Sequence, residues 1–226
     1  MTEPLPHPPG IKLLLLGATG LVGSHVLELA LASSAVGAVI APTRKPLPLY
    51  SGSRANLINM LIDFDSPDLN DPLWRVDAVI CALGTTIRQA GSREAFRQVD
   101  YDYPLTFARL AKMQGANVFA LTSATGADPS SRFFYNRVKG ELEEALVRER
   151  FTSLTLVRPG VIGGARTEVR PAETALKLGL TLFAPLLPRC WQLNPAAEIA
   201  ERLLKSVLTA SPGVSIVSAG EMTGKR

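Results

Sequence analysis

Three regularly spaced glycines follow the first apolar run of the chain and could hold an anionic ligand. Gly17, Gly20 and Gly23 form a GxxGxxG pattern after residues 11–16 (IKLLLL) and before residues 21–32, where apolar positions repeat at helical spacing. Between a strand and a helix, such glycines let the backbone approach a pyrophosphate, which the free N–H groups at the helix start then bind. The turn predicted to bind a dinucleotide comprises Gly17, Ala18, Thr19, Gly20, Leu21, Val22 and Gly23.

The residues after the second apolar run, 36–41, predict which dinucleotide binds. An Asp or Glu there would accept a hydrogen bond from the ribose 2′-hydroxyl and would repel a 2′-phosphate. The sequence instead has Thr43, Arg44 and Lys45, and a guanidinium is well suited to pair with a phosphate. We therefore expect NADP(H) to be favoured over NAD(H). Asp63, at the end of a third apolar run, is a candidate acceptor for the adenine amino group.

A tyrosine and a lysine four residues apart provide groups for proton transfer to or from an oxygen atom. Tyr135 and Lys139 would share one face of a helix predicted over residues 132–150. Ser123 lies at the end of a strand predicted over residues 117–122. Ligands bind beyond the carboxyl ends of the strands in a parallel sheet, so Ser123 is expected to face the same crevice as the dinucleotide.

Strands and helices alternate along the chain. Beyond those already described, strands are predicted over residues 77–81, 153–157 and 214–217, and helices over 93–114 and 195–208. The helix over residues 93–114 should break near Tyr103 and Pro104, because the residue before a proline resists helical geometry. The alternation predicts a doubly wound α/β fold, with a mainly parallel sheet and helices on both faces. No internal repeat or linker divides the sequence, so we expect one domain over residues 1–226.

Composition excludes several classes of protein. The chain has 226 residues, of which 46% are hydrophobic and 19% charged, values typical of a globular protein. The net charge of +4 comes from scattered basic residues without a Lys/Arg tract, so we expect no nucleic-acid partner. The two cysteines, Cys81 and Cys190, lie in no CxxC pair, which predicts neither a disulfide framework nor a metal site. Cys81 is expected to be a small buried hydrophobe.

The sequence also bears on location. Residues 1–10 (MTEPLPHPPG) contain four prolines and lack the pattern of a signal peptide, which predicts a poorly ordered leader. Residues 176–187 are apolar but too few to span a bilayer. We therefore expect a protein without membrane association in the cytoplasm.

The order of the glycine turn, Ser123, Tyr135 and Lys139 resembles that of the short-chain dehydrogenase/reductase superfamily, in its atypical NAD(P)-binding branch, over nearly the whole chain. CALGTT, VDYDYP, TSATGAD, FFYNRVKGELE and RPGVIGG are similar to the Tat-interacting oxidoreductase family and its bacterial nucleoside-diphosphate-sugar-epimerase-like relatives. The resemblance implies a Rossmann-type fold and hydride transfer between NADP(H) and a carbonyl or alcohol.

The resemblance also implies a role for each predicted catalytic residue. Tyr135 would be the acid/base and Lys139 would lower its pKa and bind the nicotinamide ribose, while Ser123 would hold the substrate oxygen. Thr122 neighbours Ser123, and an alignment shift of one residue would exchange their roles. Asp100 takes the place of an asparagine that many members use in a proton relay. The remaining predicted cofactor contacts are Ala82, Leu83, Gly84, Thr122, Pro159 and Gly160.

The chain after Arg158, a residue predicted to be structural, is too short for the substrate domain of the larger sugar-nucleotide epimerases. Residues 163–193, rich in Leu, Ala and Pro, are expected to form a small C-terminal lid over a compact or apolar substrate. Arg166 and Arg170 could meet an acidic group, and Trp191 could either cap the pocket or fill the core.

Two classes of function stay open. Ser123, Tyr135 and Lys139 favour an NADP-dependent oxidoreductase that acts on a small carbonyl or alcohol. The alternative is a regulator that senses NADPH with little or no turnover and acts through a protein partner. Either a monomer or a homodimer fits the sequence.

Overall fold

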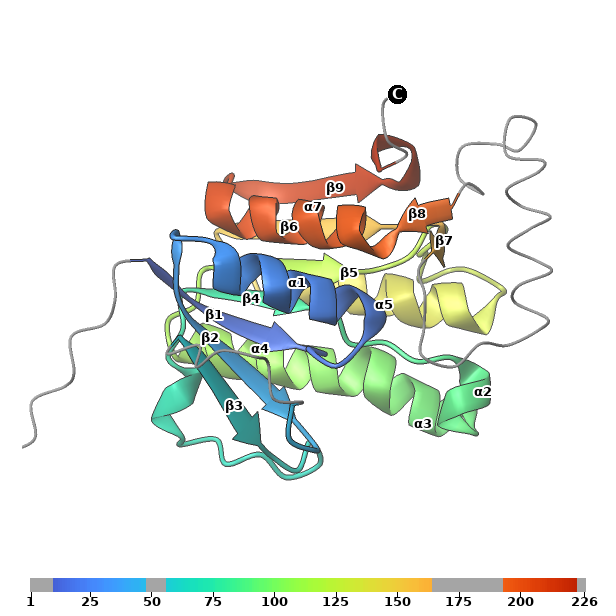
Figure 1. Ribbon diagram of the computed structural model, residues 1–226. Helices are drawn as coiled ribbons and strands as arrows, with labels where there is room; N and C mark the ends of the chain where they lie inside the picture. Colours follow the sequence, from blue (N-terminus) through green and yellow to red (C-terminus); the bar gives the residue numbers. More distant parts are fainter. Residues whose placement is uncertain (1–9, 48–55, 164–192, 223–226) are drawn as a thin grey trace, which may run out of the picture.

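The structure is a computed structural model that describes residues 10–47, 56–163 and 193–222. Its centre is a sheet of parallel strands, shown in Figure 1. Its order, β3-β2-β1-β4-β5-β6-β9, reverses direction at β1, and every adjacent pair is parallel. The seven strands are β1 (Ile11–Leu16), β2 (Val36–Thr43), β3 (Leu57–Leu61), β4 (Ala78–Cys81), β5 (Val118–Thr122), β6 (Ser153–Arg158) and β9 (Gly213–Ser218). A small second sheet pairs β7 (Val161–Gly163) with β8 (Leu193–Pro195).

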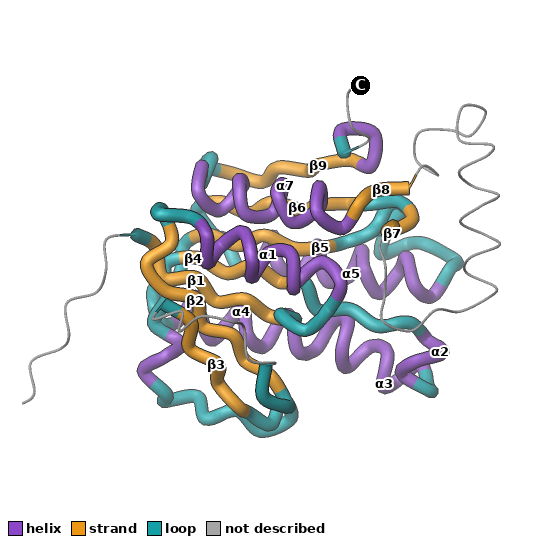
Figure 2. Tube along the Cα trace, in the orientation of Figure 1, coloured by secondary structure: helices purple, strands orange, loops and turns teal. Residues whose placement is uncertain are grey.

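Helices cover both faces of the sheet, as Figures 1 and 2 show. One face packs against α1 (Leu21–Ala32) and α7 (Ala196–Thr209), and the other against α4 (Tyr103–Met113) and α5 (Phe134–Arg148). Side chains of β1 alternate between the two cores, and all of residues 13–16 are fully buried. A strand buried on both faces needs an apolar residue at every position, which explains the unbroken run of leucines. The fold is therefore the predicted doubly wound α/β arrangement.

Most predicted elements lie within a few residues of their observed bounds. The first strand, Ile11–Leu16, and the first helix, Leu21–Ala32, begin and end where they were predicted. The second strand continues two residues further than expected, to Thr43. The predicted leader lies outside the described residues apart from residue 10, and so does nearly all of the predicted lid at 163–193.

The predicted break at Tyr103 and Pro104 is wrong. Helix α3 (Arg93–Arg97) continues through a π-helical turn, η2 (Gln98–Asp102), into α4, with Pro104 in its first turn. The N–H of Tyr103 donates to the carbonyl of Gln98, five residues back, so the wider π turn absorbs the irregularity upstream of the proline. The chain therefore stays helical and turns Asp100 into the interior, where it is 1% exposed.

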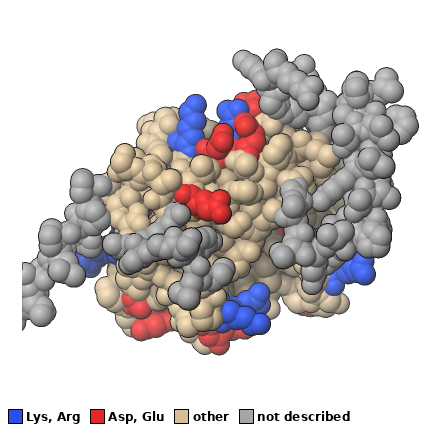
Figure 3. Space-filling view, in the orientation of Figure 1, with Lys and Arg blue, Asp and Glu red and all other residues tan. Residues whose placement is uncertain are grey.

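The remaining short helices of the described residues are η1 (Pro72–Trp74), α2 (Ile87–Ala90) and η5 (Ala219–Glu221). Within the described parts of the chain, no helix combines the length and the apolar character that crossing a membrane requires. Those parts also contain no group of three His, Cys, Asp or Glu side chains placed to hold a metal ion. On the face drawn in Figure 3, basic and acidic side chains lie interspersed among other residues.

Candidate active site

A cleft of about 460 Å³ opens at the carboxyl ends of the central strands. It brings together residues from the glycine turn, the end of β4, the end of β5, helix α5 and the segment after β6. The predicted site residues that line it are Gly20, Leu21, Val22, Ala82, Leu83, Gly84, Thr122, Ser123, Tyr135, Lys139, Pro159 and Gly160. The predicted catalytic group and much of the predicted cofactor site thus share one cavity.

The first and third glycines of the turn act through packing rather than through the cleft. Gly17 has a φ of +85°, and a Cβ there would lie 2.7 Å from the carbonyl carbon of Ala82. A Cβ at Gly23 would lie 2.0 Å from the carbonyl oxygen of Gly17. Any side chain at either position would push α1 away from the sheet, so these glycines place the start of the helix at the cleft. Ala18 and Thr19 complete the turn without lining the cavity.

The start of α1 fits a phosphate group. Gly20 is the N-cap, and neither a capping side chain nor an acidic residue occupies the first turn. Gly20, Leu21 and Val22 line the cleft, so the positive end of a twelve-residue helix faces it. Unclaimed N–H groups and a helix dipole at a cavity wall are suited to bind an anion.

The residues predicted to choose between dinucleotides lie outside the cavity. Arg44 and Lys45 are exposed after β2, and the Thr43 hydroxyl donates to the carbonyl of Lys45 at 2.7 Å. Asp63 differs from its predicted role, because its carboxylate accepts the N–H of Asp65 at 3.0 Å and the hydroxyl of Ser66 at 3.1 Å. Its side chain closes a local turn, which the sequence alone did not distinguish from adenine binding.

Lys139 forms a buried ion pair with Asp100. Their Nζ and Oδ1 atoms are 2.7 Å apart, and the side chains are 4% and 1% exposed. The other oxygen of Asp100 accepts the N–H of Thr85 at 2.8 Å. Burial alone would lower the pKa of Lys139, but the carboxylate of Asp100, together with Tyr135, raises it above its ordinary value. Lys139 is therefore a fixed positive charge at the cleft wall.

Tyr135 lies on the same helix as Lys139; the residue is 37% exposed, and its ring centroid lies 5.7 Å from that of Phe96. Removal of its hydroxyl from bulk water raises the pKa of Tyr135, Lys139 lowers it, and Asp100 raises it again. The net direction is upward, which differs from the lowered pKa that the resemblance implied. Burial is the main physical reason, and the carboxylate of Asp100 adds to it by offsetting part of the ammonium's effect.

The Ser123 hydroxyl points to a partner inside the protein. It donates to the carboxylate of Glu143, and the residue is 3% exposed. Thr122 beside it is also buried, and its hydroxyl has no hydrogen-bond partner among the described residues. The predicted contact between Ser123 and a substrate oxygen therefore competes with a bond already present.

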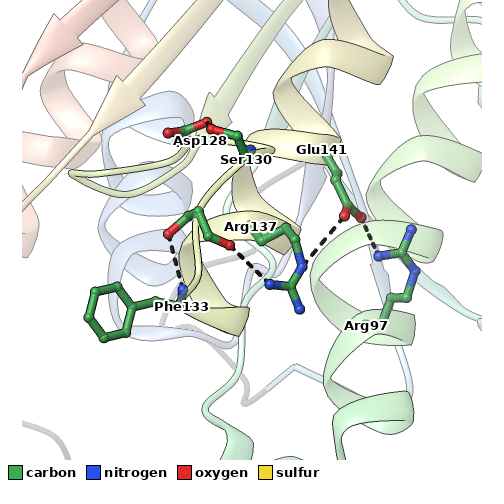
Figure 4. Close-up of polar contacts among 7 residues, drawn as sticks. Arg97, Asp128, Ser130, Phe133, Arg137 and Glu141 are labelled. Carbon is green, nitrogen blue, oxygen red and sulfur yellow. Dashed lines mark hydrogen bonds and ion pairs between the residues drawn. The ribbon is translucent and has the colours of Figure 1, made fainter.

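A chain of polar contacts holds the first turn of α5, as Figure 4 shows. Arg137 donates to the carbonyl of Ser131 at 2.9 Å and faces Glu141, which also pairs with Arg97 of α3. The Ser131 hydroxyl accepts the N–H of Phe133, the N-cap of the helix, at 3.2 Å. These contacts tie the helix that carries the tyrosine to the helix that leads into the π turn.

The loop before α5 packs onto the helix at Gly140. A Cβ there would lie 2.3 Å from backbone atoms of Asp128 and Pro129, closer than any real side chain comes. Gly140 directly follows Lys139, so the contact fixes the place of the lysine along the cleft.

The segment after β6 is held by a buried asparagine. Asn194 is fully buried, its Oδ1 accepts the N–H of Gly160 at 2.7 Å, and its Nδ2 donates to the carbonyl of Ala219 at 3.0 Å. Arg158 pairs with Glu143, which confirms its predicted structural role. Cys81 is fully buried with its pKa raised by burial to about 12, as expected of a small hydrophobe rather than a nucleophile.

Sequence reasoning omitted several residues of the cavity from the predicted site. They are Thr85, Thr86, Gln89, Ala124, Val161 and Ile162, while Asp100, which the resemblance places at the relay position, also lines the cavity. For one of them the sequence carries a signal, because threonine is a residue type typical of a helix N-cap. In the structure Thr86 caps α2 by accepting the N–H of Gln89 at 3.2 Å.

Comparisons with known proteins agree with this arrangement. A family model described as HIM1 matches residues 53–190. Protein FMP52, mitochondrial, from Lodderomyces elongisporus is 34% identical over 94% of this chain and 95% of its own length, and Protein HTATIP2 from Rattus norvegicus is 34% identical over 88% and 82%. Among solved structures, MoeE5 in complex with UDP-glucose and NAD has a TM-score of 0.67 at 16% identity, covering 94% of this chain and 79% of its own. The PhqB reductase domain from Penicillium fellutanum has a TM-score of 0.66 at 20% identity, covering 94% and 68%.

These relatives correct one expectation and establish the family. Several of them are fungal proteins named as mitochondrial, which overturns the prediction of a cytoplasmic location. The matched model and the identities over most of the chain agree with the parallel sheet and the glycine turn. The chain belongs to the HIM1 family and has a Rossmann-type fold.

Proposed function

We propose that the protein is an NADP(H)-dependent oxidoreductase that transfers hydride to or from a small carbonyl or alcohol. The observation that carries this proposal is the shared cleft, in which an uncapped helix start faces Tyr135 and the Lys139–Asp100 pair. MoeE5 is described in complex with NAD and PhqB contains a reductase domain, and both share this fold.

The cofactor would lie with its diphosphate at the start of α1 and would supply the hydride. Tyr135 is protonated at neutral pH, because its pKa is raised above the ordinary value near 10. Its hydroxyl can therefore donate a proton to a substrate oxygen as negative charge develops there. Lys139 keeps its positive charge and stabilises the phenolate that remains. These properties favour carbonyl reduction at neutral pH.

The preference for NADP(H) rests on the turn after β2. Arg44 and Lys45 are exposed there, and no acidic residue stands beside them in the sequence. Two positive charges would attract a 2′-phosphate, and no carboxylate of this turn would hold the 2′-hydroxyl of NAD(H).

One experiment tests the oxidoreductase against the sensor. NADPH binding is measured by fluorescence for the wild type and for Tyr135→Phe, and both are assayed for NADPH consumption with a panel of carbonyl compounds. We expect equal NADPH binding and at least about a hundredfold loss of turnover in the variant, because the proton donor is gone. Binding without turnover in the wild type across the whole panel would refute the enzyme and favour the sensor.

A further inference from the structure

Ser123 is held by a buried acidic group that the proposed reaction does not use. Glu143 lies two helical turns beyond Tyr135 on α5 and is 4% exposed. Both of its carboxylate oxygens pair with the guanidinium of Arg158, and one of them also accepts the Ser123 hydroxyl. The arrangement joins the ends of β5 and β6 to α5 behind the wall of the cleft.

The paired guanidinium fixes what Glu143 can do. A carboxylate that receives two hydrogen bonds from arginine is oriented in one plane, and it can only accept a hydrogen bond from the serine. A serine hydroxyl has one proton and two lone pairs. With the proton directed at Glu143, the oxygen of Ser123 has only lone pairs left for a ligand in the cleft that it lines.

We propose that Glu143 is a positioning residue that presents Ser123 to the cleft as a hydrogen-bond acceptor, so that the site takes a substrate with a hydroxyl beside its carbonyl. A carbonyl oxygen has no proton to give to Ser123, whereas a neighbouring hydroxyl does. In such a substrate Tyr135 serves the reacting oxygen and Ser123 accepts from the adjacent hydroxyl. The inference rests on the proposed function and names its class of substrate.

Two probes with the same carbon skeleton test the inference. Acetoin carries a hydroxyl beside its carbonyl, and butan-2-one carries the same carbonyl without a hydroxyl. Binding of each to the full-length protein with NADP⁺ is measured by ligand-observed NMR titration. We expect one hydrogen bond to give acetoin an affinity about fivefold higher than that of butan-2-one in the wild type. Ser123→Ala and Glu143→Gln should each bring the two affinities to within about twofold of one another.

Glu144→Gln is the matched control, because Glu144 neighbours Glu143 on α5 but has a side chain that is 50% exposed. It should keep the wild-type preference for acetoin. Ser123→Ala leaves the Glu143–Arg158 pair intact and decides the matter if Glu143→Gln fails to fold. Equal affinities in the wild type, no measurable binding of acetoin, or a preference that survives Ser123→Ala would each overturn the inference.

The titration reads binding, and any oxidation of acetoin by NADP⁺ would appear separately as NADPH absorbance, so its failure is distinct from failure of the proposed oxidoreductase. A wild type that prefers acetoin but never consumes NADPH would refute the enzyme and leave the acceptor role supported. If NADP⁺ does not bind, the same titration is made on the cofactor-free protein, with the same outcomes.

Discussion

Replacing Asp100 by asparagine removes one charge of the buried pair and leaves the Lys139 ammonium without a counter-charge. At the observed 2.7 Å, the attraction amounts to about 6 kcal/mol for an effective dielectric constant near 20. The cost of taking both charges out of water offsets part of this attraction. Asparagine can still accept the N–H of Thr85, so we expect Asp100→Asn to lower the free energy of unfolding by about 3 kcal/mol, at the lower end for a broken buried pair.

The assay is urea denaturation at pH 7 of Asp100→Asn, Lys139→Met and the double variant. The double variant should lose clearly less stability than the two single losses added together, because no unpaired buried charge remains. The Arg148–Glu144 pair is the matched control, with an almost equal distance of 2.8 Å but side chains 73% and 50% exposed. Glu144→Gln should cost at most about 0.5 kcal/mol. Additive losses at the buried pair, or equal losses at both pairs, would refute the role assigned to burial.

Three further predictions follow from other contacts. Gly140→Ala should lower the Tm in a thermal melt, because the new Cβ would lie 2.3 Å from backbone atoms. This clash should outweigh the preference for alanine over glycine within a helix, which is about 1 kcal/mol. An unchanged or raised Tm would contradict the prediction. The pKa of Lys139 is raised in the folded state, so the stability that its charge contributes is complete below about pH 10 and is lost as the pH rises through the folded pKa. Urea titrations of the wild type and Lys139→Met between pH 9 and pH 11 measure this, and a wild-type advantage that grows with pH would be inconsistent with the raised pKa. Replacing Arg44 and Lys45 with alanine should weaken NADPH binding about tenfold and NADH binding hardly at all. The control variant Arg75→Ala, at the opposite end of the sheet, should change the binding of neither cofactor. Equal weakening of NADPH and NADH binding would count against a preference for NADP(H).

The elements that could be predicted are those whose signals are local. The strand over residues 11–16 and the helix over residues 21–32 have their predicted bounds, because a mostly apolar run and a helical repeat lie on either side of a turn that contains Gly17 and Gly20. The glycine turn was also recognised locally, and its packing against Ala82 explains the requirement. The parallel direction of the strands follows from the alternation of strands and helices.

The parts that escaped prediction depend on contacts between distant residues. Asp100 and Lys139 pair across 39 positions of the sequence through a π turn that no periodicity announces. Asn194 holds Gly160 from a strand that could not be recognised by itself, because β8 has three residues. The Ser123 hydroxyl was assigned to a substrate, since its bond to Glu143 depends on how α5 lies against β5.

The central claim is that a dinucleotide binds at the start of α1, and Gly20→Val tests it most directly. Gly20 has extended backbone angles that valine adopts readily, and a Cβ there comes no closer than 3.3 Å to the carbonyl of Gly17, so the variant should fold. Its branched side chain would occupy the space in which phosphate meets the helix N–H groups. NADPH titration followed by fluorescence should show binding at least about tenfold weaker than in the wild type, with an unchanged thermal melt. Wild-type affinity for NADPH in Gly20→Val would contradict the account.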